Sequence, residues 1–200
     1  MTKGSKGLKT TKIENKLSLR MMQNADVILQ DVFVPDQNKL TYATDFAQGT
    51  EKILMGSRLS TGWGSAGIAA GAYEAALKYC LTRKQFGKPL AKFQLIQEKL
   101  SRMLSMLEMM LSNLILISQA MDKGEYTFGQ VTRIKSGCSS MSRQICLMAR
   151  EICGGNGILL ENHVMKQMMD IESLHTFEGT YEVNSLISGR ELTGGMAAFK

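Results

Sequence analysis

The sequence predicts a mainly α-helical protein, an up-down four-helix bundle preceded by the last strands of a β-domain. Apolar residues recur every three or four positions over two long stretches, which is typical of amphipathic helices. Only 2 prolines interrupt the 200 residues, so long helices are permitted. The first forty residues show instead the alternation and the β-branched side chains of strands.

Two strands are predicted near the N-terminus. Residues 8–14 alternate in character, and residues 25–34 are rich in β-branched and aromatic side chains up to Pro35. Two or three strands form a poor sheet by themselves. We therefore expect residues 1–45 to be the C-terminal remnant of a larger β-domain, and residues 46–200 to form a helical bundle domain.

The first predicted helix starts at about Thr50 and contains five glycines. Each weakens a helix by roughly 1 kcal/mol relative to alanine, so we expect these glycines to let another backbone come close. Residues 62–67 also match G-x-G-x-x-G. A dinucleotide fingerprint follows a strand and opens a helix, whereas this match lies inside a helical pattern, so close helix packing is favoured. The five glycines are Gly56, Gly62, Gly64, Gly67 and Gly71.

Three more helices are predicted. The second has apolar residues at helical spacing over 93–117, about seven turns, and ends at Gly124. The third covers 131–152 and is stopped by a pair of glycines. A shorter fourth helix covers 181–192, with a loop over 172–180 before it. Helices of this length with short connections predict an antiparallel bundle.

Composition excludes several kinds of protein. The 15 methionines fall at helical spacing and are predicted to fill the core rather than to bind copper or a partner. The 4 cysteines form no C-x-x-C pair and the 2 histidines are far apart, so no metal site is expected and the thiols are predicted to be free, in a reducing compartment. No apolar run reaches the roughly 18 residues that a membrane span needs.

The net charge of +6 comes largely from lysines among the first sixteen residues. A nucleic-acid-binding arm or a transit peptide would also be basic. This segment lacks the interleaved aromatic residues of a single-strand binder and the hydrophobic core of a leader. A solvated strand edge is the favoured interpretation, and no nucleic-acid partner is expected.

Two predicted loops carry candidate binding residues. Residues 83–87, Arg-Lys-Gln-Phe-Gly, form a basic turn in which Arg83 can make bidentate bonds to a phosphate. Residues 151–157 place three glycines at a helix end. Glycine there is ordinary helix capping, but three glycines in four positions would also let a flat ligand lie against bare backbone.

A third segment, residues 176–180, has the sequence Thr-Phe-Glu-Gly-Thr and places Glu178 beside a bulky apolar residue, just before a helix. A carboxylate in an apolar pocket accepts and holds a proton more readily, as a general base must. Gly179 lets a substrate approach the backbone, and Thr180 offers a hydroxyl. The same segment could equally cap the following helix, so both interpretations stay open.

Together, the motifs resemble the acyl-CoA dehydrogenase family over nearly the whole chain. Residues 13–20 and 31–35 are similar to the last strands of that family's middle β-domain, and the rest to its C-terminal helical bundle. Residues 176–194 are most similar to the branch that holds glutaryl-CoA dehydrogenases and short-chain acyl-CoA oxidases. The recurrent signatures are 83–87, 93–97, 154–157, 177–180 and 189–190.

The resemblance implies FAD-dependent α,β-dehydrogenation of an acyl-CoA thioester. It implies that Glu178 is the catalytic base, that the Gly179 amide polarises the thioester oxygen, and that Arg58 faces the CoA side of the substrate. Thr180 would contact FAD, and Phe199 would close over it. The other FAD-binding residues that it implies, partly acting from a neighbouring subunit, are Arg83, Phe86, Gln94, Glu151, Ile152, Cys153, Gly154 and Gly155.

Family members also have an N-terminal helical domain and a complete middle β-domain, so we expect this chain to be a truncated part of the enzyme that does not turn over substrate alone. The implied partners are an acyl-CoA substrate, the other subunits of a homotetramer and an electron-transfer flavoprotein. An acyl-CoA oxidase and a non-catalytic helical oligomerisation module are the alternatives. The location is expected to be mitochondrial or peroxisomal, although the sequence shows no S-K-L signal.

Overall fold

The computed structural model describes residues 2–195, apart from the side chain of Lys52. The chain divides into two compact units between Ile53 and Leu54. Phe199, which the sequence assigns to the cofactor site, lies outside the described residues.

The first unit contains one β-hairpin. Strands β1 (Leu8–Lys12) and β2 (Ala25–Leu29) pair antiparallel, with Leu8 opposite Leu29. Both strands are shorter than predicted, and β2 ends before Asp31, whose φ of 50° departs from the extended conformation. All five side chains of β2 are exposed, so the hairpin buries none of the apolar residues that predicted this strand. A 3₁₀ turn, Asp36–Asn38, follows Pro35.

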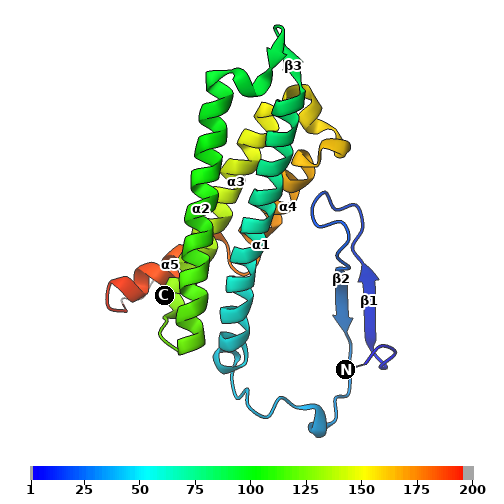
Figure 1. The fold of residues 1–200 in the computed structure, drawn as a ribbon. Coiled ribbons are helices and arrows are strands. Elements are labelled where there is room, and N and C mark those ends of the chain that lie inside the picture. The colour runs from blue at the N-terminus through cyan, green and yellow to red at the C-terminus, as the bar shows by residue number, and fades with distance from the viewer. Residues whose placement is uncertain (1, 196–200) are drawn as a thin grey trace. The chain divides into compact units, whose positions relative to one another are not determined.

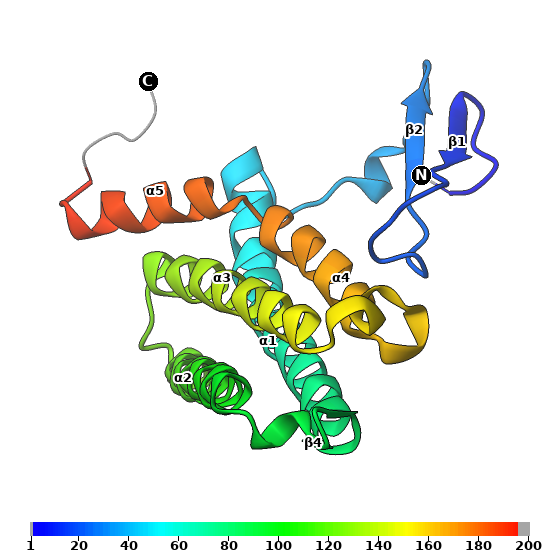
Figure 2. The same cartoon turned by 90° about the horizontal axis from the view of Figure 1, so that it is seen from above.

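The helical bundle forms the second unit. Helix α1 (Phe46–Thr82) starts in the first unit and runs through the second, and a small hairpin of β3 (Lys84–Gln85) and β4 (Lys88–Pro89) leads from it to α2 (Gln94–Lys123). Helix α3 (Phe128–Ile152) packs against α2, α4 (Val164–Thr176) and α5 (Tyr181–Leu192). Figures 1 and 2 show α3 at the centre of these helices. The mainly helical prediction is confirmed.

Helix α4 was missed by the sequence analysis, which predicted a loop over residues 172–180. Residues 172–176 belong to α4, so only 177–180 connect it to α5. The residue that precedes the helix, His163, has a φ of 58° and makes no side-chain capping hydrogen bond. Its buried apolar residues are only Val164, Ile171 and Leu174, which makes a short and incomplete stripe. The sequence of this helix therefore contains neither a recognisable N-cap residue nor a clear helical period of apolar residues.

The glycines of α1 make room for side chains, not for a second backbone as predicted. A methyl group at Gly62 would lie 2.8 Å from Cδ2 of Leu114 on α2, and one at Gly71 would lie 2.9 Å from the side-chain amide of Gln167 on α4. Gly56 has open space around it. Small residues also contribute to the buried face of α1 from Ala66 onward: Ala66, Ala69, Ala72 and Ala76.

The core follows the predicted residue types. Met103 and Met110 are fully buried, and all four cysteines are free and buried. Burial raises the pKa of the Cys138 and Cys146 thiols to about 12, so both stay protonated and unreactive at neutral pH.

One expectation about membranes needs correction. Helix α2 has the length and, with a mean hydropathy of 1.4, the composition to cross a membrane, although no uninterrupted apolar run predicted it. A core helix passes the same test, and the side chains that α2 buries in the bundle are Met103, Leu107, Met110, Leu114 and Ile117.

Candidate active site

The loop between α4 and α5 holds Glu178 in an unusual backbone conformation. Its φ is 58°, in the left-handed region, which costs a non-glycine residue roughly 1–2 kcal/mol. The side chain is half-buried, and its Oε2 atom accepts a hydrogen bond of 2.6 Å from Oγ of Ser57 on α1. A strained residue of this kind persists only where its surroundings hold it in place.

Three buried side chains from three helices bind the backbone carbonyls of this loop. Nε of Arg58, on α1, donates to the carbonyl of Glu178 at 2.9 Å. Nζ of Lys135, on α3, donates to the carbonyl of Gly179 at 2.7 Å. Nδ2 of Asn184, on α5, donates to the carbonyls of Gly179 and Thr180 at 2.7 and 3.0 Å. The loop is therefore fixed from several directions.

The surroundings of Glu178 are polar, in contrast to the apolar pocket expected from the sequence. Two cations, Arg58 and Lys135, are 4% and 0% exposed. Desolvation lowers the pKa of both groups, and the pKa of Lys135 falls to about 8, with the charge of Arg58 as a second cause. The carboxylate of Glu178 opposes both shifts. The guanidinium of Arg58 also lies over the ring of Phe128, 4.7 Å from its centre.

Two polar atoms at this site, Nη1 of Arg58 and Oδ1 of Asn184, are buried and have no hydrogen-bond partner within the described part of the chain. The backbone amides of Glu178 and Gly179 likewise have no acceptor among residues 2–195. A loop with free N–H donors beside a carboxylate can bind a substrate carbonyl and accept a proton from the carbon next to it.

Within the segment 176–180, the capping interpretation applies to Thr180 and not to Glu178. The hydroxyl of Thr180 accepts a hydrogen bond of 3.3 Å from the amide of Val183 and caps α5. The carboxylate of Glu178 takes no part in this cap and faces Ser57 on α1. The capping hypothesis thus accounts for Thr180 and leaves Glu178 available for chemistry.

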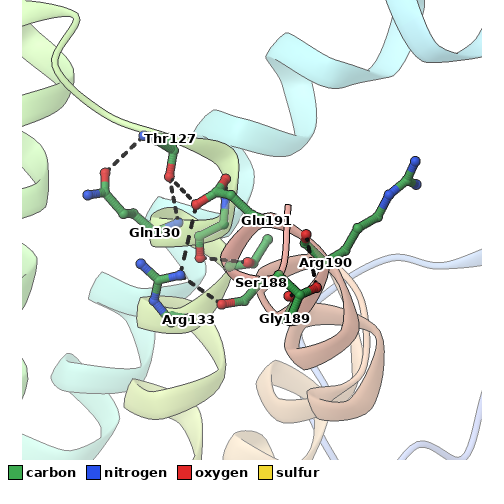
Figure 3. Close-up of polar contacts among 10 residues, drawn as sticks. Thr127, Gln130, Arg133, Ser188, Gly189, Arg190 and Glu191 are labelled. Atoms are coloured by element: carbon green, nitrogen blue, oxygen red, sulfur yellow. Dashed lines mark hydrogen bonds and ion pairs between the residues drawn. The ribbon is translucent and has the colours of Figure 1, made fainter. Parts of the chain in front are cut away.

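The far end of α5 is bound to the start of α3. The carboxylate of Glu191 accepts hydrogen bonds of 2.6 Å from Oγ1 of Thr127 and 2.8 Å from the amide of Gly129, as Figure 3 shows in part. These bonds lower the pKa of Glu191. Nη1 of Arg133 donates to Oγ of Ser188 at 2.8 Å (Figure 3). The C-terminal part of α5 is therefore held to the first half of α3.

Most of the predicted FAD-binding residues lie elsewhere, around the β3–β4 hairpin. A cleft of about 310 Å³ is lined by five of them together with Tyr79 and Asn156. The guanidinium of Arg83 makes no hydrogen bond or ion pair to any residue that the structure describes, and it is exposed. The five residues are Arg83, Ile152, Cys153, Gly154 and Gly155.

Four of the other predicted residues do not line this cleft: Phe86, Gln94, Glu151 and Thr180, the last of which lies beside Glu178. The side chain of Phe86 is 92% exposed at the turn of the hairpin, and Gln94 is exposed at the start of α2. Glu151 forms an ion pair of 2.6 Å with Lys99, which lowers the pKa of its carboxyl group.

The Glu178 loop and the Arg83 cleft are at opposite ends of the bundle. Arg58 and Thr82 are separated along α1 by about 36 Å, at roughly 1.5 Å per residue. Figure 1 shows β3 at one end of α1 and α5 near the other. A single chain therefore does not bring the predicted catalytic base and the predicted dinucleotide-binding residues into one site.

Three residues of the site were not predicted: Ser57, Lys135 and Asn184. The signal for Lys135 was present, because it lies four residues after Val131 and three before Cys138, on the apolar stripe of α3. A lysine in such a register is either an interruption of the stripe or a buried functional cation. Ser57 and Asn184 carry no comparable signal in the sequence.

The fold agrees with the comparisons with known proteins. Residues 47–193 match the sequence profile of the family described as acyl-CoA dehydrogenase, C-terminal domain. Because this match covers most of the chain, it identifies the protein as an oxidoreductase of the acyl-CoA dehydrogenase class. The chain belongs to the acyl-CoA dehydrogenase family.

Individual relatives support the same assignment. The chain is 31% identical over 186 residues to a probable acyl-CoA dehydrogenase, YngJ, from Bacillus subtilis, covering 93% of this chain and 49% of the relative. It is 31% identical over 183 residues to CarC, a subunit of the caffeyl-CoA reductase–Etf complex of Acetobacterium woodii, covering 92% and 48%. The chain thus spans about half the length of these curated relatives.

The solved structures lead to the same conclusion. Glutaryl-CoA dehydrogenase from Mycobacterium smegmatis superposes with a TM-score of 0.95 at 32% identity, over 100% of this chain and 51% of that one. A structure of a glutaryl-CoA dehydrogenase from the same organism in complex with FADH2 has a TM-score of 0.95 at 30% identity, with the same coverage. The resemblance read from the motifs is confirmed at the level of the family.

Proposed function

We propose that Glu178 is the catalytic base in the FAD-dependent α,β-dehydrogenation of an acyl-CoA thioester. The observation that carries the proposal is the geometry of the loop. A carboxylate is oriented by Ser57 at 2.6 Å and lies on a strained turn whose carbonyls are bound by buried side chains. Because the chain spans about half the length of its relatives, the activity is proposed for the whole protein.

In this mechanism, Glu178 removes a proton from the carbon next to the thioester carbonyl. Negative charge then develops on the thioester oxygen. The backbone amides of Glu178 and Gly179, which have no acceptor among the described residues, are available to bind that oxygen. Fixed donors aimed at developing charge lower the barrier, because they need no reorganisation during the reaction.

Arg58 has a structural part in this mechanism, in addition to the contact with CoA that the sequence resemblance implies. Its Nε donates to the carbonyl of Glu178, while its Nη1 is buried and meets no hydrogen-bond partner among the residues that the structure describes. A substrate or a water molecule that reached Nη1 would satisfy this donor. Arg58 can therefore hold the loop with one nitrogen and contact a ligand with another.

The cleft at Arg83 fits the dinucleotide part of FAD. Arg83 supplies an unpaired guanidinium, and Gly154 and Gly155 present exposed backbone without side chains beside it. A phosphate group needs a cation and close approach to backbone, and both are present. When bound, FAD accepts the hydride from the β-carbon of the substrate. Phe86, Gln94, Glu151, Thr180 and Phe199 complete the set that the resemblance implies.

A complete site would need more than one subunit. The base and the Arg83 cleft are about 36 Å apart along α1, so FAD held at Arg83 of one chain would meet Glu178 of another. This supports a homo-oligomer, which we propose to be a tetramer. Helix α2 exposes apolar side chains that suit such packing: Leu104, Leu111, Ile115 and Leu116. An electron-transfer flavoprotein is the proposed acceptor, since CarC is named as a subunit of a complex with Etf.

The test is anaerobic reduction of the bound flavin by short acyl-CoAs and by glutaryl-CoA. The purified whole protein is expected to keep yellow flavin after desalting and to bleach on addition of substrate, whereas this chain alone is expected not to turn over substrate. Glu178→Gln should keep the flavin, but reduction of the flavin by acyl-CoA should be slower by about 100-fold or more, as expected for loss of a general base. Glu182→Gln, the same change at an exposed position four residues later, is the control and should behave as wild type.

Each alternative gives a distinct result. Peroxide formed when oxygen is readmitted would identify an oxidase. A colourless, helical and oligomeric protein would favour the oligomerisation module. Wild-type bleaching in Glu178→Gln would contradict the assignment of the base.

A further inference from the structure

Lys135 is a buried cation whose role the proposed reaction does not yet include. It lies in the middle of α3 and is 0% exposed. A charged side chain is seldom buried unless its polar atoms find partners, because desolvation is costly. The partners of Lys135 therefore indicate what this lysine does.

Lys135 donates hydrogen bonds to two backbone carbonyls, one before and one after Glu178 in the sequence. Its Nζ donates to the carbonyl of His175 at 3.1 Å and to the carbonyl of Gly179 at 2.7 Å. The carbonyl of His175 belongs to the last turn of α4, where four carbonyls lack partners within the helix. One ammonium group thus caps α4 and binds the loop beyond Glu178.

This bridge closes a turn that needs support. Glu178 has a φ of 58° and Gly179 a φ of 88°, so two consecutive residues adopt left-handed conformations. We expect this turn to relax when its ends are released, because the left-handed conformation of Glu178 is unfavourable in a free chain. With Lys135 in place, the ends of the turn are fixed and the carboxylate reaches Ser57.

We propose that Lys135 is the positioning residue that sets the direction of the Glu178 carboxylate, by joining the end of α4 to the loop through one buried ammonium group. The inference rests on the proposed function for its catalytic consequence. Besides burial, the charge of Arg58 on α1 lowers the pKa of Lys135, and the charge of Glu178 in the loop raises it. The charge of Lys135 in turn lowers the pKa of His175 at the end of α4.

The first test measures the loop and is independent of activity. Hydrogen exchange is followed at the amides of Phe177 and Val183, which are hydrogen-bonded on either side of Glu178. Lys135→Met keeps an unbranched, apolar side chain of similar length and should raise both exchange rates roughly tenfold or more. Ile145→Ala, a buried truncation about 15 Å further along α3, is the control and should leave these two amides unchanged.

The second test separates positioning from stability. In Lys135→Met, the rate of flavin reduction at saturating acyl-CoA should fall roughly 10- to 100-fold, because a displaced base reacts slowly. The acyl-CoA concentration for half-saturation should change by less than about threefold. Lys135→Arg, which keeps the charge and donors, should recover part of the rate.

Wild-type exchange at Phe177 and Val183 in Lys135→Met would overturn the proposal. So would faster exchange together with an unchanged rate of flavin reduction. If the wild-type protein reduces no flavin with any acyl-CoA, the proposed function fails, and the exchange measurement alone decides whether Lys135 holds the loop. If Lys135→Met does not fold, Lys135→Gln, which keeps a donor but no charge, is measured in the same way.

Discussion

Ser57 donates a hydrogen bond of 2.6 Å to the carboxylate of Glu178, although 121 positions separate the two residues in the sequence. The bond fixes one carboxylate oxygen from α1, while the backbone of the same residue is held through its carbonyl by Arg58 one position later. Adjacent residues of α1 therefore control both the side chain and the main chain of the candidate base.

Replacing Ser57 by alanine should slow flavin reduction about tenfold, because the carboxylate gains freedom to rotate. The free energy of unfolding should fall by no more than about 1 kcal/mol, the usual contribution of one hydrogen bond. Stopped-flow reduction and urea unfolding measure the two effects. Ser60→Ala is the control, since that hydroxyl is exposed and bonds only to the carbonyl of Gly56 in its own helix. An equal loss in both variants would argue against a specific role for Ser57.

Gly179→Ala should destabilise the protein by about 1–2 kcal/mol, because a φ of 88° is strained for alanine. The added methyl group would also lie 3.0 Å from Nδ2 of Asn184 and 3.4 Å from Nη2 of Arg58. Thermal unfolding gives the comparison with Gly189→Ala. Gly189 lies inside α5 with open space around it, so alanine there should stabilise by up to about 1 kcal/mol. Equal effects at the two glycines would contradict the geometry of the loop.

Glu191→Ala should remove the carboxylate that binds the first turn of α3 and lower the free energy of unfolding by about 1 kcal/mol. Because the pKa of Glu191 is lowered in the folded protein, this stabilisation is present above the pKa of the unfolded chain and is lost as the pH falls through the folded value. Urea unfolding from pH 7 to pH 3 should show the variant and the wild type converging. A constant difference over this range would exclude the ionised carboxylate as the cause.

The buried charge of Lys135 predicts a dependence of stability on alkaline pH. Its pKa falls from 10.5 to about 8 on folding, so between these values the unfolded chain binds more protons than the folded one. Stability then rises with pH, by at most about 1.4 kcal/mol per pH unit. The wild type should therefore gain stability relative to Lys135→Met between about pH 8 and pH 10.5. Parallel curves for the two proteins would show that this lysine titrates normally.

Much of the fold follows from signals that are local in the sequence. Helix α2 ends at Gly124, whose φ is 72°, as the glycine and the end of the apolar period predicted. Helix α5 covers the predicted residues, Tyr181–Leu192, and Thr180 provides its cap. Helix α4 was missed because it has no capping residue and little apolar period.

The candidate site was only partly predictable, because its function depends on contacts between distant positions. The loop around Glu178 could be recognised from its own residues. The hydroxyl, the ammonium and the amide that hold it come from α1, α3 and α5, and only the folded chain brings them together. The expectation of an apolar pocket around Glu178 was wrong for the same reason. Arg58 and Lys135 are buried close to Glu178 in the fold but are distant from it in the sequence.

The length of α1 has a genetic consequence. Because the Glu178 loop and the Arg83 cleft lie at opposite ends of this helix, a chain altered at one end keeps the other end intact. In the oligomer that we propose, an allele carrying Glu178→Gln and an allele carrying Arg83→Ala would each be inactive alone. Expressed in one cell, they would form mixed assemblies in which some sites combine two unaltered ends. Two recessive lesions in the same gene would then complement each other.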